Sequence, residues 1–434
     1  MTERLFTPRF FVMCGFSFTV FLSAFQLFPT APFHILALGG STFASGLFLG
    51  ILTYASAFSA PLTGALVDRA GAREVLVVAS VAITAFSIAY AVIPDYRIML
   101  GLVVVHGIFW SGLLTGSGAY ITNILPEQRR AEGLAYWGLS TIAAIAVAPP
   151  IGFWVFRFGW RVMCLEAAAL NVAMACIAWT LPPQSRERSE PAERRASERV
   201  GGSGGAKPPG RLIERSEPAE RRASERVGGS GGAKPPGRLI EWKVLVLSFT
   251  LFLYSFGYGG VTSFTALYAD ANGVHPKGIF LTTLALAILV TRPMSGRLGD
   301  RFGYRRILLP SLVIVAIGLS ILIFGGTKVH LIASAIIYGA GFGTAYPVFV
   351  SYVLRHVTRE RRGAAFGAIL ACFDTGIGTG STTMGWIIGA YGFPAAFGTG
   401  TVLCTLSVPY FLIADPLLRR ATGSHSDHSD HKVR

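Results

Sequence analysis

The chain has 434 residues, of which 52% are hydrophobic and only 14% are charged, with a formal net charge of +15. This composition excludes an ordinary soluble globular protein. Apolar runs of 20 residues and more recur along the sequence, and each could cross a hydrocarbon layer of about 30 Å as a helix. We therefore expect an all-α integral membrane protein. The five cysteines fall inside apolar runs without metal-like spacing, so we interpret them as small hydrophobic residues.

The apolar runs predict twelve transmembrane helices, six on each side of a polar centre. We expect an N-terminal six-helix half at 1–181, a linker at 182–242, a C-terminal six-helix half at 243–416 and a polar tail at 417–434. The predicted spans are residues 9–36, 43–67, 74–93, 97–124, 132–156, 160–181, 243–269, 276–297, 306–326, 329–354, 363–389 and 393–415.

The predicted linker contains one 27-residue segment twice without a difference, at Arg188–Glu214 and Arg215–Glu241. Its glycine, proline, serine and charged residues cannot bury a core, so we predict disorder. Most lysines and arginines lie on the side that carries both termini and this linker. This distribution predicts cytoplasmic termini in a bacterial inner membrane, and it explains the basic charge without a nucleic-acid partner.

One charged motif occurs in both halves. Gly64–Arg73 reads GALVDRAGAR, and Gly296–Arg305, 232 residues later, reads GRLGDRFGYR. Each copy lies between the second and third spans of its half, where its glycines allow a tight turn with positive φ and its charges can pair or cap helix ends. The shared residues that we expect to act together are Gly64, Asp68, Arg69, Gly71 and Arg73, matched by Gly296, Asp300, Arg301, Gly303 and Arg305.

The pattern G-x-x-x-D-R-x-G-x-R resembles the signature loop of the major facilitator superfamily. Two further landmarks repeat at nearly the same spacing, RRAEGLA with RRGAAFG and FGWR with YGFP. The resemblance implies two six-helix pseudo-repeats, the fold of this superfamily, which rock around a central cavity in a functional monomer. It also implies that the loops holding Asp68 and Asp300 act as conformational latches.

Two helices indicate which members the chain resembles. Ala144–Phe153 keeps Pro149 and Gly152 of the fifth-helix pattern of proton-coupled drug exporters. Their fourth-helix R-x-x-Q-G reads VVVHG here, at Val103–Gly107, so the arginine is absent and His106 replaces the glutamine. The resemblance is therefore greatest to bacterial drug- and sugar-efflux members of the arabinose efflux permease type.

Ionisable residues within predicted spans are candidate functional residues, because charge at membrane depth is costly. Asp374 lies in the eleventh span, where burial favours a neutral carboxyl and makes reversible protonation a candidate role. It could instead be a structural residue bonded to a neighbouring helix. His106 is a second candidate for proton coupling, although packing is the favoured interpretation of a single histidine in an apolar helix. Glu166 is a third, on a helix that the resemblance places outside the substrate path.

Five polar or amphipathic residues are candidate substrate contacts. Each is also compatible with helix packing. Arg292 could snorkel to the membrane surface, bind an anionic substrate group or pair with Asp374. The candidates are Gln26, His106, Tyr258, Arg292 and Tyr346.

The sequence thus predicts a secondary active transporter that exports a small organic solute by alternating access, coupled to protons. Proton-linked uptake of a small organic anion or sugar is an alternative, as is a non-transporting membrane sensor on the same fold. We expect no enzyme, cofactor or metal, because the sequence has neither a phosphate-binding G-x-x-x-x-G-K-[ST] loop nor clustered His, Cys and carboxylate residues. The expected partners are the small-molecule substrate, protons and the lipid bilayer.

Overall fold

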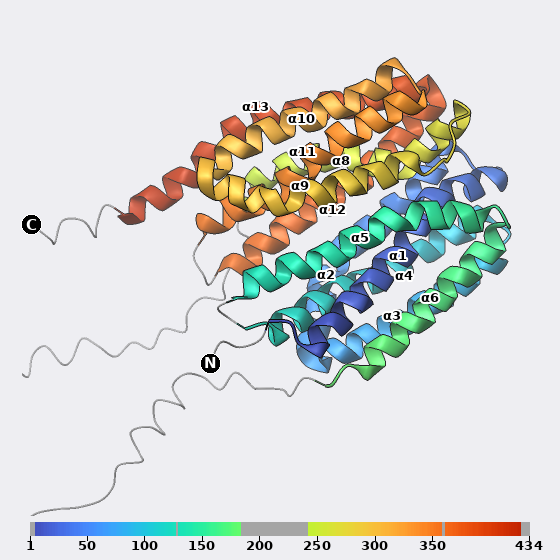
Figure 1. Cartoon of the computed structure of the whole chain (residues 1–434), viewed down its shortest axis with the longest axis horizontal. Helices are drawn as coiled ribbons and strands as arrows, with labels where there is room; N and C mark the ends of the chain where they lie inside the picture. The colour runs from blue at the N-terminus through green and yellow to red at the C-terminus, as the bar shows by residue number, and fades with distance from the viewer. Residues whose placement is uncertain (1–4, 127–128, 184–241, 358–360, 427–434) are drawn as a thin grey trace, which may run out of the picture. The chain divides into compact units, whose positions relative to one another are not determined.

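The structure is a computed structural model. It describes residues 5–126, 129–183, 242–357 and 361–426. Twelve long helices occupy these residues, in the predicted order (Figure 1). They are α1 (Pro8–Ala37), α2 (Thr42–Ala70), α3 (Ala72–Val92), α4 (Tyr96–Ile124), α5 (Arg130–Phe156), α6 (Trp160–Thr180), α8 (Trp242–Ala271), α9 (Ile279–Phe302), α10 (Tyr304–Phe324), α11 (Lys328–Arg355), α12 (Arg362–Tyr391) and α13 (Phe393–Ser426).

The predicted fold class is confirmed, with six helices before the linker and six after it in the described residues. Eleven of these helices are long and apolar enough to cross a membrane. The twelfth, α12, is rich in glycine and threonine and packs against α2 and α8. Helix α13 continues to Ser426, beyond the expected span end at 415. Most of the predicted disordered linker, residues 184–241, lies outside the described residues, as does the tail beyond Ser426.

The two halves share backbone turns at equivalent positions. Gly71 and Gly303 end α2 and α9 with φ of 107° and 90°, so the positive φ predicted for the charged motif is confirmed. Gly159 and Gly392 adopt φ of 105° and 83° before the sixth helix of each half. These values fall in the region that favours glycine, which explains why glycine occupies both copies of each turn.

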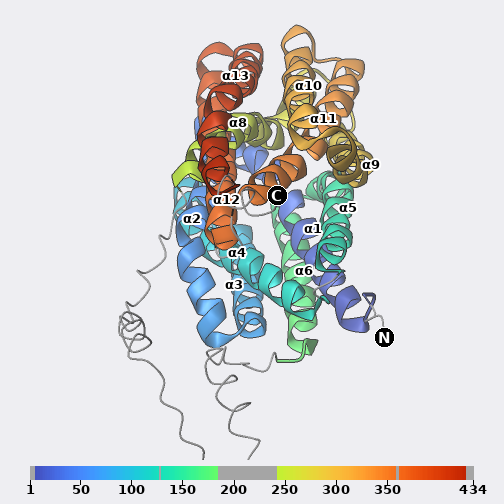
Figure 2. The same cartoon turned by 90° about the vertical axis from the view of Figure 1, so that its left-hand side faces the viewer.

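Helix α12 joins the halves, since it contacts α2 of the N-terminal half as well as its own neighbour α8 (Figure 2). The approach is close at Gly46, where a Cβ atom would overlap the carbonyl of Ser381. Ser381 donates a hydrogen bond from Oγ to the Gly46 carbonyl at 2.9 Å. Two more bonds tie α2 to α12, from Thr42 Oγ1 to the Gly385 carbonyl at 2.7 Å and between the hydroxyls of Tyr54 and Thr379 at 2.6 Å.

A second junction between the halves involves the turn between α8 and α9. Lys277 forms an ion pair with Asp270 at 2.7 Å and lies over the ring of Phe33 in α1 at 4.8 Å. The next residue, Gly278, is so close to Pro149 and Phe153 of α5 that a Cβ atom would lie 3.2 Å from each. Both junctions lie toward the end of the bundle opposite the termini, which we call the far end.

The other end, which we call the terminal end, carries the start of α1 and the charged motifs. Here α2 exposes large apolar side chains: Phe58, Leu62 and Leu66 are 79%, 60% and 46% exposed. These residues follow the part of α2 that contacts α12. The halves are therefore packed together at the far end, while one face of the last turns of α2 is exposed and the opposite face, with Thr63 and Val67, is buried.

Candidate functional site

The C-terminal copy of the charged motif forms a network within its own half. Asp300, on the last turn of α9, accepts hydrogen bonds from the Tyr304 hydroxyl at 2.6 Å and from Arg355 Nη2 at 2.9 Å. The Arg355 guanidinium also lies 4.3 Å above the Tyr304 ring. Arg305 pairs with the buried Asp415 of α13 at 3.4 Å. The motif therefore fastens α9, α10, α11 and α13 to one another.

The N-terminal copy is arranged differently. Arg73 donates from Nη2 to the Trp179 carbonyl at 2.9 Å and lies 5.3 Å above the Trp179 ring, which joins α3 to α6. Asp68 is exposed, and within the described part of the chain it forms no ion pair or hydrogen bond. Asn123 lies 232 residues before Arg355 and occupies the equivalent position. The N-terminal half therefore has no arginine at the position from which Arg355 pairs with Asp300.

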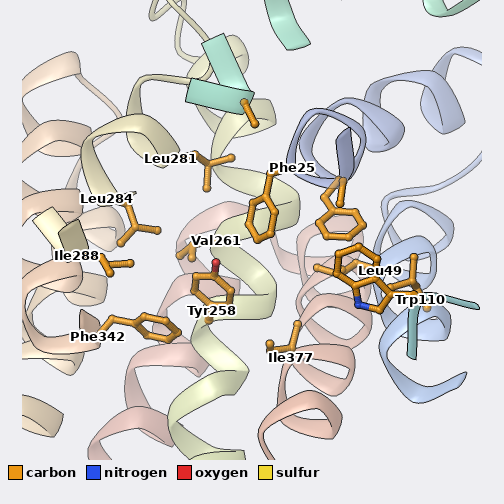
Figure 3. Close-up of a cluster of buried hydrophobic side chains, with 14 of the residues drawn as sticks. Phe25, Leu49, Trp110, Tyr258, Val261, Leu281, Leu284, Ile288, Phe342 and Ile377 are labelled. Carbon is orange, nitrogen blue, oxygen red and sulfur yellow. The ribbon is translucent and has the colours of Figure 1, made fainter. Parts of the chain in front are cut away.

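Aromatic rings line the middle of the C-terminal half. Phe342 of α11 stacks on Tyr254 and Tyr258 of α8, with centroids 4.8 and 4.4 Å apart. Tyr346, one turn further along α11, contacts the ring of Phe373 in α12 at 4.8 Å. Across the halves, Phe25, Leu49 and Trp110 join Tyr258, Val261, Phe342 and Ile377 in one apolar cluster (Figure 3).

We call the rings of Tyr254, Tyr258, Phe342, Tyr346 and Phe373 the aromatic wall. Three predicted site residues belong to this wall or lie beside it at similar depth. Arg292, Tyr346 and Asp374 lie ten, nine and twelve residues from the terminal-end limits of their helices, or roughly 14 to 18 Å at helical rise. Tyr346 is within electrostatic range of both charged side chains. All three side chains are half-buried. The structure thus brings together three candidates that belong to three different helices.

The helix that carries Arg292 is longer than predicted. The predicted span ended at residue 297, but α9 continues to Phe302 through the charged residues Arg297, Asp300 and Arg301, so snorkelling of Arg292 to the membrane surface stays a prediction. Its proposed pairing with Asp374 is not formed, because no ion pair joins them among the described residues. The side chain of Asp374 likewise makes no hydrogen bond within the described chain, which does not support the structural alternative of bonding to a neighbouring helix.

Glu166 and Gln26 lie together, away from the Asp374 region. Gln26 of α1 is fully buried and donates from Nε2 to Glu166 Oε1 of α6 at 3.2 Å. The other oxygens, Gln26 Oε1 and Glu166 Oε2, are buried and have no hydrogen-bond partner among the described residues. Gly152 of α5 approaches Gln26 so closely that a Cβ would lie 2.9 Å from its side chain. The retained fifth-helix glycine therefore packs against a predicted substrate contact.

His106 lies within the N-terminal half. Its Nδ1 is 3.0 Å from the Tyr90 hydroxyl, and its ring stacks on Phe86 with centroids 5.4 Å apart. Beside it is a cavity with room for about one water molecule, lined also by Ser87 and Asn171. This environment agrees with the packing interpretation and separates His106 from the aromatic wall of the C-terminal half.

Sequence analysis missed several residues of these sites. Arg355 and Asp415 hold the motif, yet both lie far from it in sequence. Phe342 and Phe373 could have been found, since one precedes Tyr346 by a helical turn and the other adjoins Asp374. In the described residues, no group of three His, Cys, Asp or Glu side chains could hold a metal ion.

Comparison with known proteins identifies the family to which the chain belongs. The family model described as Major Facilitator Superfamily matches residues 11–276 and 247–430. The chain belongs to the Major Facilitator Superfamily. This superfamily member is therefore a multi-pass membrane transporter.

Curated relatives of this superfamily transporter align along most of its length. The multi-drug resistance efflux pump PmrA homolog of Lactococcus lactis is 23% identical over 393 residues, covering 88% of each chain. The multidrug resistance protein MdtG of Yersinia enterocolitica is 23% identical over 401 residues, covering 89% of this chain and 88% of the relative. The crystal structure of a D-xylose-proton symporter matches with a TM-score of 0.69 and 14% identity, covering 93% of this chain and 96% of the symporter. At that identity, the match supports the superfamily fold alone.

Proposed function

We propose that this protein is a secondary active transporter that exports a small organic solute from the cytoplasm in exchange for protons. The terminal end would then face the cytoplasm, in agreement with its excess of lysine and arginine. The protein lies in a bacterial inner membrane in this proposal. The Lactococcus lactis relative is named a multi-drug resistance efflux pump and the Yersinia enterocolitica relative a multidrug resistance protein, and these names support export.

The observation that carries the proposal is the position of Asp374. Its carboxyl lies about 18 Å from the terminal-end limit of α12, is part-exposed, and has no ion-pair partner among the described residues. Burying a lone carboxylate in a protein interior costs far more free energy than burying a neutral carboxyl. Asp374 can therefore take up a proton in one facing state and release it in the other.

The coupling would follow from competition. A substrate group bound beside Asp374 stabilises the ionised carboxylate and so displaces its proton. When the substrate leaves, protonation neutralises the site and lets the empty transporter return. Glu166 is less suited to this role, because its carboxyl already contacts Gln26 and is not part of the aromatic wall.

The test is proton movement in inverted membrane vesicles, reported by a pH-sensitive dye. The panel comprises lipophilic cations, sugars and small carboxylates, added without an imposed gradient. We expect at least one compound to make the vesicle lumen more alkaline with the intact protein and not with Asp374→Asn. Asp270→Asn is the control, since Asp270 is an exposed carboxylate at the far end, paired with Lys277.

The sign of the signal decides direction. Acidification of the lumen would indicate symport and overturn export. An equal response from Asp374→Asn would remove Asp374 from the coupling mechanism, and His106 would be tested next.

A further inference from the structure

The charges beside the aromatic wall indicate more than a coupling site. Arg292 and Asp374 carry opposite formal charges at similar depth, and neither has an ion-pair partner among the described residues. Opposite charges within a protein interior normally pair with each other, because pairing offsets part of their desolvation. Here Tyr346 lies within electrostatic range of both, and they remain apart.

The backbone holds the two charges in place from different helices. On one side, Gly343 of α11 lies against α9, where a Cβ would be 3.1 Å from the Ile288 Cα, one turn before Arg292. On the other side, Ser255 of α8 donates to the Phe373 carbonyl at 2.8 Å, immediately before Asp374. These contacts with α11 and α8 therefore fix the backbone of α9 and α12 next to Arg292 and Asp374.

Part of the aromatic wall lies beside these charges. Phe342 and Tyr346 are on α11, and Phe373 is on α12 with its ring 6.2 Å from Phe342 and 4.8 Å from Tyr346. Such rings favour a planar or apolar body, and their faces also attract cations. A molecule on this surface would lie near both charges, since Asp374 follows Phe373 in the chain and Tyr346 is within electrostatic range of Arg292 and Asp374.

We propose that the substrate is an amphipathic zwitterion, with an apolar or aromatic body, an anionic group bound by Arg292 and a cationic group bound by Asp374. This inference rests on the proposed transport function and names its substrate class. A guanidinium pairs well with a carboxylate or phosphate group, and a carboxylate pairs well with an ammonium group.

The charges leave room for a substrate between them. No nitrogen of Arg292 lies within 4.0 Å of a carboxylate oxygen of Asp374, since the structure forms no ion pair between them. A dipeptide with aromatic side chains belongs to the proposed substrate class, because it has an anionic end, a cationic end and an apolar body.

Four peptides with one body test the proposal by isothermal titration calorimetry on the full-length protein in lipid nanodiscs. Phenylalanyl-phenylalanine carries both charges, its amide only the positive charge, its N-acetyl form only the negative charge, and the doubly capped form neither. We expect the zwitterion to bind at least about tenfold more tightly than any capped form, because each capped form loses at least one hydrogen-bonded charge pair.

Two variants assign the charges. Arg292→Gln should reduce zwitterion affinity to that of the peptide amide, and Asp374→Asn should reduce it to that of the N-acetyl form. Arg297→Gln is the matched control, because Arg297 lies on the same helix and is exposed. Size-exclusion profiles and thermal transitions of all variants, measured in parallel, verify that they are folded.

Several results would overturn the proposal. They are equal binding of the four peptides, tighter binding of the amide than of the zwitterion, an unchanged preference in Arg292→Gln, or no binding by any peptide. Failure of proton exchange is a separate result, because binding does not require coupling. If the zwitterion preference persists while phenylalanyl-phenylalanine moves no protons in the vesicle assay, the substrate class stands and the proton-coupled function fails.

Discussion

The contact between Gln26 and Glu166 indicates whether the Glu166 carboxyl is ionised or neutral in the folded protein. One hydrogen bond joins them, yet Gln26 Oε1 and Glu166 Oε2 are both buried acceptors that lack a partner in the described part of the chain. A proton on Glu166 would allow its carboxyl to donate to Gln26, so that both oxygens are satisfied. Leaving both unsatisfied would cost about 1–3 kcal/mol for each buried group. We infer that Glu166 is protonated and structural.

This inference predicts that Glu166→Gln preserves the contact, because an amide can both accept from and donate to Gln26. Thermal unfolding in nanodiscs should give the same transition temperature as the intact protein or a higher one. Glu166→Leu should lower it, since the Gln26 amide then has no partner, at a cost of about 1–3 kcal/mol. Proton movement should survive in Glu166→Gln. Its loss would place the coupling group in the N-terminal half.

At the scale of elements, the packing of α12 against α2 is determined by small residues. Ser381 and Gly46 meet through a backbone contact and a hydrogen bond of 2.9 Å, and Ser381 also contacts the Ser263 hydroxyl of α8 at 2.7 Å. Helices in a membrane associate through such close packing and interhelical hydrogen bonds. The low hydropathy of α12 is explained by this position between two helices.

Gly46→Ala should therefore weaken closure at the far end, because its Cβ would overlap the Ser381 carbonyl. Overpacking of this kind costs about 1–3 kcal/mol. We expect a lower thermal transition and faster labelling of a cysteine introduced at Tyr54, which bonds Thr379 across the same junction. Gly101→Ala is the control, since nothing lies within 4 Å of its added Cβ. Equal labelling of the two variants would contradict the prediction.

Helices and their order could be predicted because hydropathy and the repeated motif are local properties of the sequence. The turn at Gly71 and Gly303 was likewise predictable, since glycine there reflects a backbone requirement. Partners were not predictable, because Arg355 and Asp415 reach the motif through helix packing over long sequence separations. The end of α9 was predicted at residue 297 rather than at Phe302, because charged residues near that end lower its hydropathy.

For the whole molecule, the two motif copies report on the facing state. The halves meet at the far end, where Lys277 lies over Phe33, while α2 exposes Phe58 and Leu62 near the terminal end. In this state Asp300 is bonded within its half, but Asp68 forms no ion pair within the described chain. If the halves rock to cover the terminal end, Asp68 becomes able to accept bonds from the facing half. Asp68 then stabilises the state in which the terminal end is closed, which is not the state of this structure.

Asp68→Asn should accordingly leave thermal stability unchanged and shift the population toward the state open at the terminal end. Transport should fall by roughly tenfold, because about 1.4 kcal/mol changes a two-state equilibrium by that factor. Labelling of a cysteine introduced at Leu62, which is 60% exposed here, should become faster. Asp300→Asn is the comparison: it removes the exposed Asp300–Arg355 pair within one half, so it should lower thermal stability slightly. Unchanged transport and labelling in Asp68→Asn would show that this copy of the motif is not a latch.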